Sequence, residues 1–375
     1  MADVEASGER MMRPEGSVVE YSYMGDSGLR VSNICLGTST FGDQSHEIGR
    51  PASDDAESLK ILNKFVELGG NYIDTSDLYS CGGSEKLIGT WLPGVCRDEL
   101  VINTKFSLPT NKKQPNAVGT SRKHLVEALT GSLDRLNTHY VDTYLIHYFD
   151  RQTPLEQTFR TLNDFVRSGK VHYLGVSNFT GWQLQKVVDI AKYMGLEKVV
   201  NIQSEYSLLT RSAEYELIDV CRNEKVGLTP WCPLKGGWLA GKIKKGMTKP
   251  PEGSRIAWHS ERLQAAKVFK KSITCISWGE YEDNQVVWDT LEAVEDIAKS
   301  QGKSMAQVSL RWLLQKDVVP SVVIGAKTVA QLVDNMGAGS GWSLTDDEMK
   351  RLNDVSALPL PETYFNATIL DKYRT

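Results

Sequence analysis

The sequence lacks any arrangement of cysteines that would indicate disulfides or a metal site. Its cysteines form no CxxC pair and show no spacing typical of zinc ligands. The six are Cys35, Cys81, Cys96, Cys221, Cys232 and Cys275. This pattern predicts reduced thiols and no bound metal, as in a cytoplasmic protein. The sequence leaves open whether Cys81 or Cys232 is sensitive to oxidation.

Long apolar runs and an excess of one charge are missing as well. No run approaches the roughly 18 apolar residues of a membrane span, and the polar, acidic start of the chain does not read as a signal peptide. Lysine and arginine number 43 against 47 aspartates and glutamates, for a formal net charge of -4. Such a balance gives no field that would attract nucleic acid or an anionic membrane. We therefore expect a soluble, cytoplasmic protein without a nucleic-acid partner and without membrane insertion.

The motifs of several enzyme classes are also absent. The chain has no GxSxG, no HExxH and no cluster of histidines, so acyl transfer and metal-assisted hydrolysis lack their residues. The sequence Gly302-Lys303-Ser304 resembles the end of a phosphate-binding loop, but Ile297 stands where the first glycine is required. The glycines of residues 337–342 follow a predicted helix rather than a strand, so they do not form a dinucleotide-binding fingerprint.

What the sequence does contain is a regular alternation of β-prone and helical segments. Eight apolar runs are predicted as strands, and most are followed by a segment with helical periodicity. The runs are residues 33–37, 72–74, 99–106, 141–147, 172–178, 199–206, 226–231 and 318–326. Such alternation predicts a parallel sheet, and eight units favour an α/β fold of the (β/α)8 TIM barrel type. An open, doubly wound sheet is the alternative that the pattern leaves open.

Other segments fall outside this alternation. Residues 18–33 are predicted as an N-terminal β-hairpin that plugs one end of the barrel. The excursion at residues 235–260 is expected to form a flap over a site, with extra helices after the seventh strand and at the C-terminus. We expect a disordered tail at residues 1–18 and a single barrel domain at residues 19–375.

Polar residues stand where the predicted strands end, and in a barrel these ends meet at one mouth. They are Asp74, Lys105, His147, Asn178, Gln203 and Trp231, with Tyr79 in the loop after the second strand. A tyrosine, with an ordinary pKa of about 10, exchanges a proton near neutral pH only beside a cation. Lys105 supplies such a charge, Asp74 holds the lysine, and His147 can hydrogen-bond a substrate oxygen. The set suits hydride transfer to an aldehyde or ketone.

Each of these residues also has an ordinary structural interpretation. Asp74 could cap a helix, Tyr79 and Trp231 could belong to the core, and Lys105 and His147 could be a strand-end charge and a structural histidine. Their occurrence together at four strand ends favours the catalytic interpretation.

A series of motifs makes the chain resemble the aldo-keto reductase family from about residue 21 to about residue 352. In chain order they are NYIDTSDLYSCGGSEKLIG, VINTKF, YLIHYFD, GVSNF, NIQSEYSLL, TPWCPLKGG, KPPEGSR, MAQVSLRW and VVIGAKTVAQLVDN. Their order and spacing are specific to the family. The resemblance implies a (β/α)8 barrel that binds NADP(H) without the glycine fingerprint and reduces a small-molecule carbonyl substrate.

The resemblance also implies roles for individual residues. The catalytic carboxylate, tyrosine, lysine and histidine of the family fall on Asp74, Tyr79, Lys105 and His147. The family's residues that bind the amide of the nicotinamide fall on Ser177, Asn178 and Gln203. The aromatic residue that stacks on the nicotinamide ring, usually a tyrosine, falls on Trp231. The adenosine end falls on Gly325, Lys327, Thr328, Gln331 and Asn335. There Lys327 and free amides at the start of the next helix would meet the 2′-phosphate.

Two positions depart from the family pattern, because Ser76 replaces the commoner alanine and Ile324 the commoner proline. Neither position holds a reacting group. Two other functions stay open: a cofactor-binding regulatory subunit of a membrane channel, and an enzyme working mainly as an NADP-dependent alcohol dehydrogenase. The sequence identifies neither the physiological substrate, the protein partners nor the oligomeric state.

Overall fold

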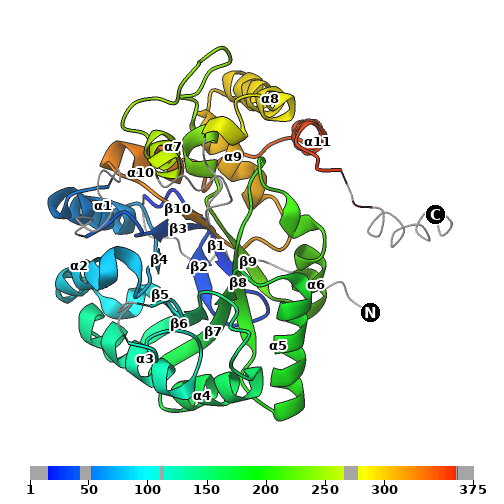
Figure 1. The fold of residues 1–375 in the computed structure, drawn as a ribbon. Coiled ribbons are helices and arrows are strands. Elements are labelled where there is room, and N and C mark those ends of the chain that lie inside the picture. Colours follow the sequence, from blue (N-terminus) through cyan, green and yellow to red (C-terminus); the bar gives the residue numbers. More distant parts are fainter. Residues whose placement is uncertain (1–15, 43–51, 110–113, 266–277, 360, 362–375) are drawn as a thin grey trace, which may run out of the picture.

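Parallel strands form the centre of the molecule, which a computed structural model describes for residues 16–42, 52–109, 114–265, 278–359 and 361 (Figure 1). The strands follow the order β10-β3-β4-β5-β6-β7-β8-β9, and all hydrogen-bonded neighbours in this order are parallel. They are β3 (Ile34–Gly37), β4 (Tyr72–Asp74), β5 (Val101–Phe106), β6 (Val141–Ile146), β7 (Val171–Ser177), β8 (Val199–Glu205), β9 (Gly227–Trp231) and β10 (Val322–Ile324). The N–H of Leu228 donates to the carbonyl of Val318 at 2.8 Å, which draws β9 toward the segment leading into β10. The predicted (β/α)8 barrel is confirmed.

Two strands are shorter than predicted by two residues or more, each for a local reason. The run 99–106 begins its strand only at Val101, because Arg97–Glu99 forms a 3-10 turn. The run 318–326 pairs only at Val322–Ile324, since Pro320 has no N–H to donate to a neighbouring strand.

Helices surround the strands. They are α1 (Asp55–Glu67), α2 (Gly83–Trp91), α3 (Arg122–Leu136), α4 (Leu155–Arg167), α5 (Gly181–Met194), α6 (Leu217–Glu224), α7 (Arg255–Ala265), α8 (Gln285–Gln301), α9 (Met305–Leu314), α10 (Val329–Met336) and α11 (Asp346–Val355). The extra helices predicted after the seventh strand and at the C-terminus are present as α8 and α11. The excursion at residues 235–260 is less irregular than expected, because α7 begins inside it at Arg255.

The predicted hairpin lies at the N-terminal end of the barrel. Strand β1 (Tyr21–Tyr23) pairs antiparallel with β2 (Arg30–Ser32). Its turn docks on the loop before β9, where Asp26 N–H donates to the carbonyl of Lys225 at 3.1 Å. Gly25 has a φ of 58°, and a Cβ there would lie 2.4 Å from that carbonyl oxygen, so only glycine fits. The hairpin adds Met24 and Val31, both fully buried, to an apolar cluster with residues of the barrel strands.

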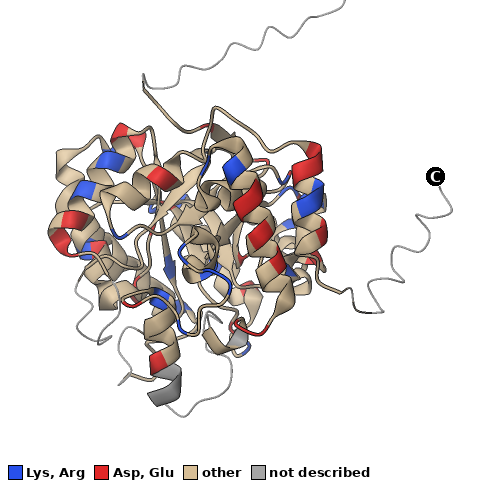
Figure 2. Cartoon of the chain, turned by 90° about the horizontal axis from the view of Figure 1, so that it is seen from above, with Lys and Arg blue, Asp and Glu red and all other residues tan. Residues whose placement is uncertain are grey.

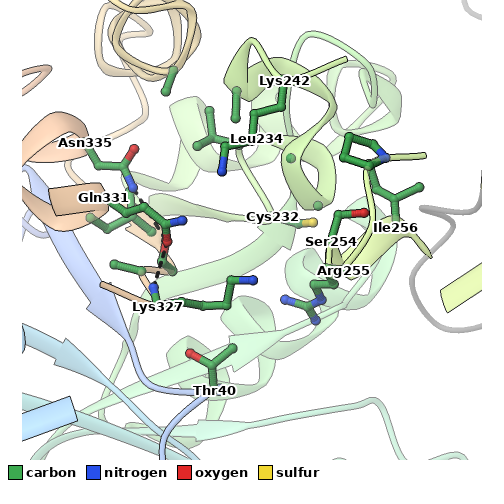
Figure 3. A pocket seen from close by; sticks show the side chains of 18 of the residues that line it. Thr40, Cys232, Leu234, Lys242, Ser254, Arg255, Ile256, Lys327, Gln331 and Asn335 are labelled. Carbon is green, nitrogen blue, oxygen red and sulfur yellow. Dashed lines mark hydrogen bonds between the residues drawn. The ribbon is translucent and has the colours of Figure 1, made fainter. Parts of the chain in front are cut away.

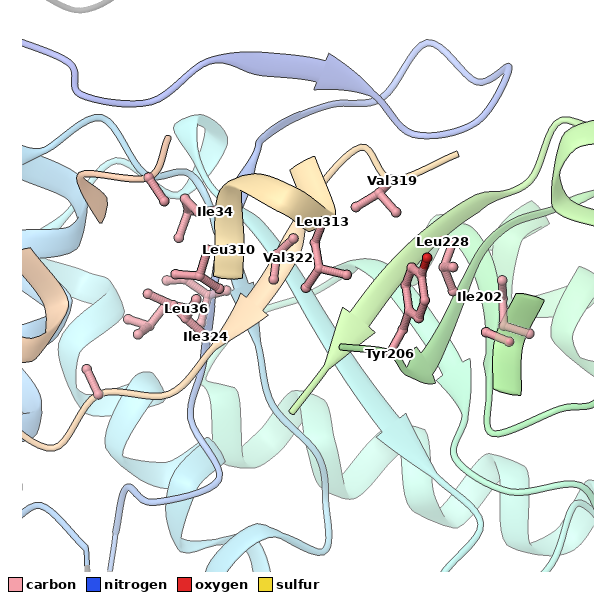
Figure 4. Packing of buried hydrophobic residues seen from close by; sticks show 14 of the residues in the cluster. Ile34, Leu36, Ile202, Tyr206, Leu228, Leu310, Leu313, Val319, Val322 and Ile324 are labelled. Carbon is pink, nitrogen blue, oxygen red and sulfur yellow. The ribbon is translucent and has the colours of Figure 1, made fainter. Parts of the chain in front are cut away.

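Apolar side chains fill the space between strands and helices. Figure 4 shows Leu310 and Leu313 of α9 beside Val322 of β10, and all three are fully buried. Lysines and arginines are interspersed with aspartates and glutamates over the outer helices (Figure 2).

Residues 1–15 of the predicted tail lie outside the described residues, so the boundary at residue 18 and the single-domain assignment stay predictions.

Two helical glycines give a matched test of packing between α2 and α3. A Cβ on Gly89 would lie 2.1 Å from the backbone carbonyl oxygen of Arg135, whereas a Cβ on Gly131 would meet only the end of the Arg135 side chain, at 2.9 Å. We expect Gly89→Ala to lower the free energy of unfolding by about 1–3 kcal/mol through overpacking. Gly131→Ala should be neutral or raise it by up to about 1 kcal/mol. Urea unfolding measures both, and equal stability of the two variants would contradict this packing.

Candidate active site

Four of the predicted site residues meet at the carboxyl ends of β4, β5 and β6. Asp74 is the last residue of β4, Lys105 lies near the end of β5, and His147 directly follows β6. Tyr79 begins a short 3-10 helix in the connection from β4 to α2. Parallel strands of a barrel present their carboxyl ends at the same mouth, which is why residues distant in sequence lie together here.

The ammonium group of Lys105 is the centre of this arrangement. It donates to Oδ2 of Asp74 at 2.7 Å, to the carbonyl of Thr75 at 2.8 Å and to the hydroxyl of Tyr79 at 3.2 Å. The side chains of Lys105 and Asp74 are 0% and 2% exposed. Burial alone would lower the pKa of Lys105, but the charges of Asp74 and Tyr79 and its hydrogen bonds to both raise the pKa above its usual value. The lysine therefore stays protonated beside the phenol oxygen.

The other oxygen of Asp74 accepts hydrogen bonds from two amides. Asn103 Nδ2 donates to Oδ1, and so does Gln203 Nε2, at 2.9 Å. Both oxygens of the buried carboxylate are thereby satisfied, as a buried ion pair requires. Gln203, predicted as a cofactor ligand, is tied directly to the carboxylate.

The imidazole of His147 is buried and neutral. It stacks on the ring of Tyr148, with centroids 5.1 Å apart, and meets the ring of Tyr79 edge-on at 6.0 Å. Nδ1 lies 3.3 Å from Oγ of Ser76. Burial, and then the charge of Lys105, lowers the pKa of His147 well below its usual value. A neutral imidazole carries one N–H, which it can offer to a substrate oxygen.

The residues predicted to contact the nicotinamide form a second linked group. Asn178, with a left-handed φ of 58°, donates through Nδ2 to the carbonyl of His147 at 3.1 Å and to Ser177 Oγ at 3.0 Å. Its Oδ1 accepts from Trp231 Nε1 at 3.0 Å. These contacts join the ends of β7 and β9 to the segment that carries His147, and they orient a half-buried indole ring.

A cavity of about 420 Å³ lies between the turn after β10 and the long insertion (Figure 3). Four of the five residues predicted for the adenosine end line it, namely Gly325, Lys327, Gln331 and Asn335. Thr328 is not among the lining residues and acts as the N-cap of α10. Lys242, Ser254 and Arg255 of the insertion face Lys327 and Gln331 across the cavity.

Three cations, Lys242, Arg255 and Lys327, line this cavity together with two carboxylates, Glu252 and Asp334. Burial, and then the charges of Lys242 and Arg255, lowers the pKa of Lys327. The Nε of Arg255 is buried and has no hydrogen-bond partner within the described part of the chain. Three cations and a donor without an acceptor fit a ligand that carries phosphate groups.

Three of the backbone amides at the start of α10, where the sequence led us to expect free donors for phosphate, already have acceptors within the protein. Lys327 N–H donates to Gln331 Oε1 at 2.9 Å, and Gln331 N–H donates to Thr328 Oγ1 at 3.2 Å. Val329 N–H donates to Glu57 Oε1 at 2.9 Å. The carboxylate of Glu57, from α1, takes the place of an external anion at this helix end. The cations around the cavity, rather than these amides, are available to phosphate.

Comparisons with known proteins agree with this geometry. The model of the aldo/keto reductase family matches residues 33–357. The chain belongs to the aldo/keto reductase family. It is 32% identical to versiconal hemiacetal acetate reductase of Aspergillus parasiticus, over 90% of this chain and 96% of that protein. Aryl-alcohol dehydrogenase [NADP(+)] of Phanerodontia chrysosporium is 31% identical, over 87% and 83% of the two chains. A putative voltage-gated potassium channel subunit beta of Schizosaccharomyces pombe is 30% identical, over 90% and 93%.

This aldo/keto reductase is therefore an oxidoreductase built on a (β/α)8 barrel. No group of three or more His, Cys, Asp or Glu within the described ranges could hold a metal ion. No helix in those ranges is both long and apolar enough to cross a bilayer.

The sequence predicted that the insertion forms a flap over a site, but the residues expected to bind the cofactor in this aldo/keto reductase all lie elsewhere in the chain. Lys242, Ser254 and Arg255 of the insertion line the cavity. The motif KPPEGSR contains two of them, but it carried only the family resemblance. Nothing local marks Arg255 as a partner of Lys327, because the two meet only through the folding of the insertion.

The buried pair of Asp74 and Lys105 predicts an asymmetric response to mutation. Asp74→Asn leaves a buried ammonium without its counter-charge, so we expect the free energy of unfolding to fall by about 3–5 kcal/mol. The double variant Asp74→Asn/Lys105→Met removes both charges and should lose less than the single variant. Urea unfolding of the three proteins tests this. If the free energy of unfolding of Asp74→Asn lies within about 0.5 kcal/mol of that of the unmutated protein, Asp74 and Lys105 do not behave as a buried ion pair.

Proposed function

We propose that this aldo/keto reductase reduces aldehydes or ketones to alcohols with NADPH. The observation that supports it best is the position of the Lys105 ammonium, within hydrogen-bond distance of both the Asp74 carboxylate and the Tyr79 hydroxyl. A phenol with a cation at this distance can release its proton to a nearby oxygen. The neutral His147 lies beside the same phenol.

Each residue has a distinct task in this proposal. The reduced nicotinamide, when bound, supplies a hydride to the carbonyl carbon. Tyr79 donates the proton to the carbonyl oxygen, and the charge of Lys105 stabilises the phenolate that remains. Asp74 keeps Lys105 charged and in place. His147 donates a hydrogen bond that orients the carbonyl oxygen.

The cofactor residues are assigned in the same way. We propose that Ser177, Asn178 and Gln203 hold the nicotinamide amide and that Trp231 stacks on its ring. The residues proposed for the adenosine end are Gly325, Lys327, Thr328, Gln331 and Asn335. The cations around the cavity support NADPH over NADH, and one relative carries NADP(+) in its name. The substrate is a small carbonyl compound, and a cytoplasmic location is proposed from composition alone.

Replacing Tyr79 by phenylalanine removes the acid and keeps the ring. We expect kcat for carbonyl reduction to fall about 10²-fold to 10⁴-fold, while the affinity for NADPH changes little. Steady-state kinetics and cofactor titration measure the two quantities separately. Near-normal turnover would mean that another group supplies the proton.

Lys327→Met removes one of the three cations at the cavity. We expect NADPH to bind roughly tenfold to a hundredfold more weakly, about 1.5–3 kcal/mol, because a charge-assisted hydrogen bond is lost. NADH lacks the 2′-phosphate, so its affinity should change little. Fluorescence titration with both cofactors makes the comparison. An equal loss of affinity for NADPH and NADH would mean that Lys327 has a structural role. Unchanged affinity for both would mean that the 2′-phosphate binds elsewhere, against Arg255 and Lys242.

The proposed function as a whole is tested by following NADPH oxidation with a panel of aldehydes, ketones and quinones. Turnover of at least one class is expected. Tight NADPH binding without turnover of any would favour a regulatory role, as in a channel subunit, the function for which one relative is named. Faster oxidation of alcohols with NADP⁺ would favour a dehydrogenase.

A further inference from the structure

Ser76 connects the catalytic histidine to a buried acid that the proposed mechanism does not use. Its Oγ lies 3.3 Å from His147 Nδ1, 3.3 Å from Asp77 Oδ1 and 3.4 Å from the carbonyl oxygen of Lys105. It also accepts from Leu78 N–H at 3.2 Å. All of these atoms belong to residues at the mouth of the barrel.

A serine hydroxyl has one proton to donate and two lone pairs to accept with, so it cannot serve all four neighbours. Leu78 N–H uses one lone pair. The carbonyl of Lys105 already accepts from the N–H of Asp77 at 3.1 Å, so it does not depend on the serine. Two partners remain, Asp77 and the ring of His147. One must donate to Ser76, and the other must accept from it.

The surroundings of Asp77 favour its carrying a proton. It is 1% exposed, and its Oδ2 has no hydrogen-bond partner within the described residues. The ionisable groups around it are Glu85 of α2, Arg135 of α3 and Tyr144 of β6. The one cation, Arg135, donates to Glu85 at 2.7 Å, and Thr104 donates to the other oxygen of Glu85 at 2.6 Å. Burial, and then the charge of Glu85, raises the pKa of Asp77 to about 8.

We propose that Asp77 is a positioning residue which, when protonated, fixes the tautomer of His147 through Ser76. The acid proton goes to Ser76 Oγ, and the serine proton goes to His147 Nδ1. The single proton of the neutral ring then resides on Nε2, the nitrogen left to donate to a substrate oxygen. This inference concerns the protein alone, although its catalytic meaning rests on the proposed carbonyl reduction.

Ionisation of Asp77 reverses the direction of these hydrogen bonds. The carboxylate can only accept, so the serine hydroxyl turns toward Asp77 and offers a lone pair to the ring. His147 then donates from Nδ1, and Nε2 becomes an acceptor. In total one proton leaves the protein from Asp77, and one moves within the imidazole from Nε2 to Nδ1. A ring in this form cannot donate to a carbonyl oxygen.

Nitrogen-15 spectra of the protein labelled at its histidines measure the tautomer directly, without substrate or cofactor. The His147 signals are identified by their loss in His147→Gln. At about pH 6.5 we expect the pattern of a proton on Nε2, and at about pH 9.5 a change toward a proton on Nδ1, with a midpoint near the pKa of Asp77. The same tautomer at both pH values would overturn the proposal.

Three variants test whether the change of the His147 tautomer depends on Asp77 and Ser76 or follows from pH in general. Asp77→Asn has the same shape but does not titrate, so one tautomer should persist across the range. Ser76→Ala keeps Asp77 but breaks the connection, and the response should vanish. Asp164→Asn removes an exposed carboxylate of α4 and should respond as the unmutated protein does. A response in Asp77→Asn equal to that of the unmutated protein would overturn the proposal.

Kinetics provide a second readout if the protein reduces a carbonyl substrate. From about pH 7 to about pH 9 the kcat of the unmutated protein should fall about tenfold more than that of Asp77→Asn, because one pH unit above its pKa an acid is about nine-tenths ionised. Identical pH profiles of kcat would overturn the catalytic part. Absence of any reductase activity would refute the proposed function but leave the tautomer measurement intact.

Discussion

The buried ion pair between Lys105 and Asp74 is the interaction on which the rest of the site depends. An ammonium group buried at the mouth of a barrel is stable only with a counter-charge and acceptors for its protons. Asp74 and the carbonyl of Thr75 supply these, and the third contact of Lys105 is the phenol of Tyr79. One set of hydrogen bonds therefore both satisfies the buried charge and holds the ammonium beside the phenol that we propose as the proton donor.

The same carboxylate ties the proposed catalytic and cofactor residues together. Its second oxygen accepts from Gln203 of β8, and through the β7–β8 pairing Gln203 lies opposite Ser177. Asn178 then reaches back to the carbonyl of His147 and forward to Trp231. Polar groups at the ends of β4 to β9 are thus connected to one another. The cavity proposed for the cofactor phosphates is built differently, from the turn after β10 and a long insertion, so its charge can vary without disturbing the proposed catalytic group.

Much of this organisation could be predicted from the sequence, because it depends on local patterns. The segment YID followed by Tyr79, and VINTKF ending in a lysine, are strands whose polar ends are visible in the chain. The barrel supplies the rest, since parallel strands present these ends at one mouth. Three features could not be predicted. Arg255 meets Lys327 only through the fold of the insertion, Glu57 reaches the amide of Val329 from 272 positions away, and α7 begins directly after a stretch rich in glycine, lysine and proline.

The central claim is that hydride passes from the cofactor to a carbonyl carbon at this mouth. It is tested most directly with NADPH carrying deuterium at the transferable position of nicotinamide C4 and an aldehyde that the protein reduces, with the product analysed by mass spectrometry and NMR. The account predicts one deuterium on the carbinol carbon of each alcohol molecule formed and none on its oxygen after exchange with water. Alcohol without deuterium on carbon, or with deuterium only when the solvent is deuterated, would contradict it.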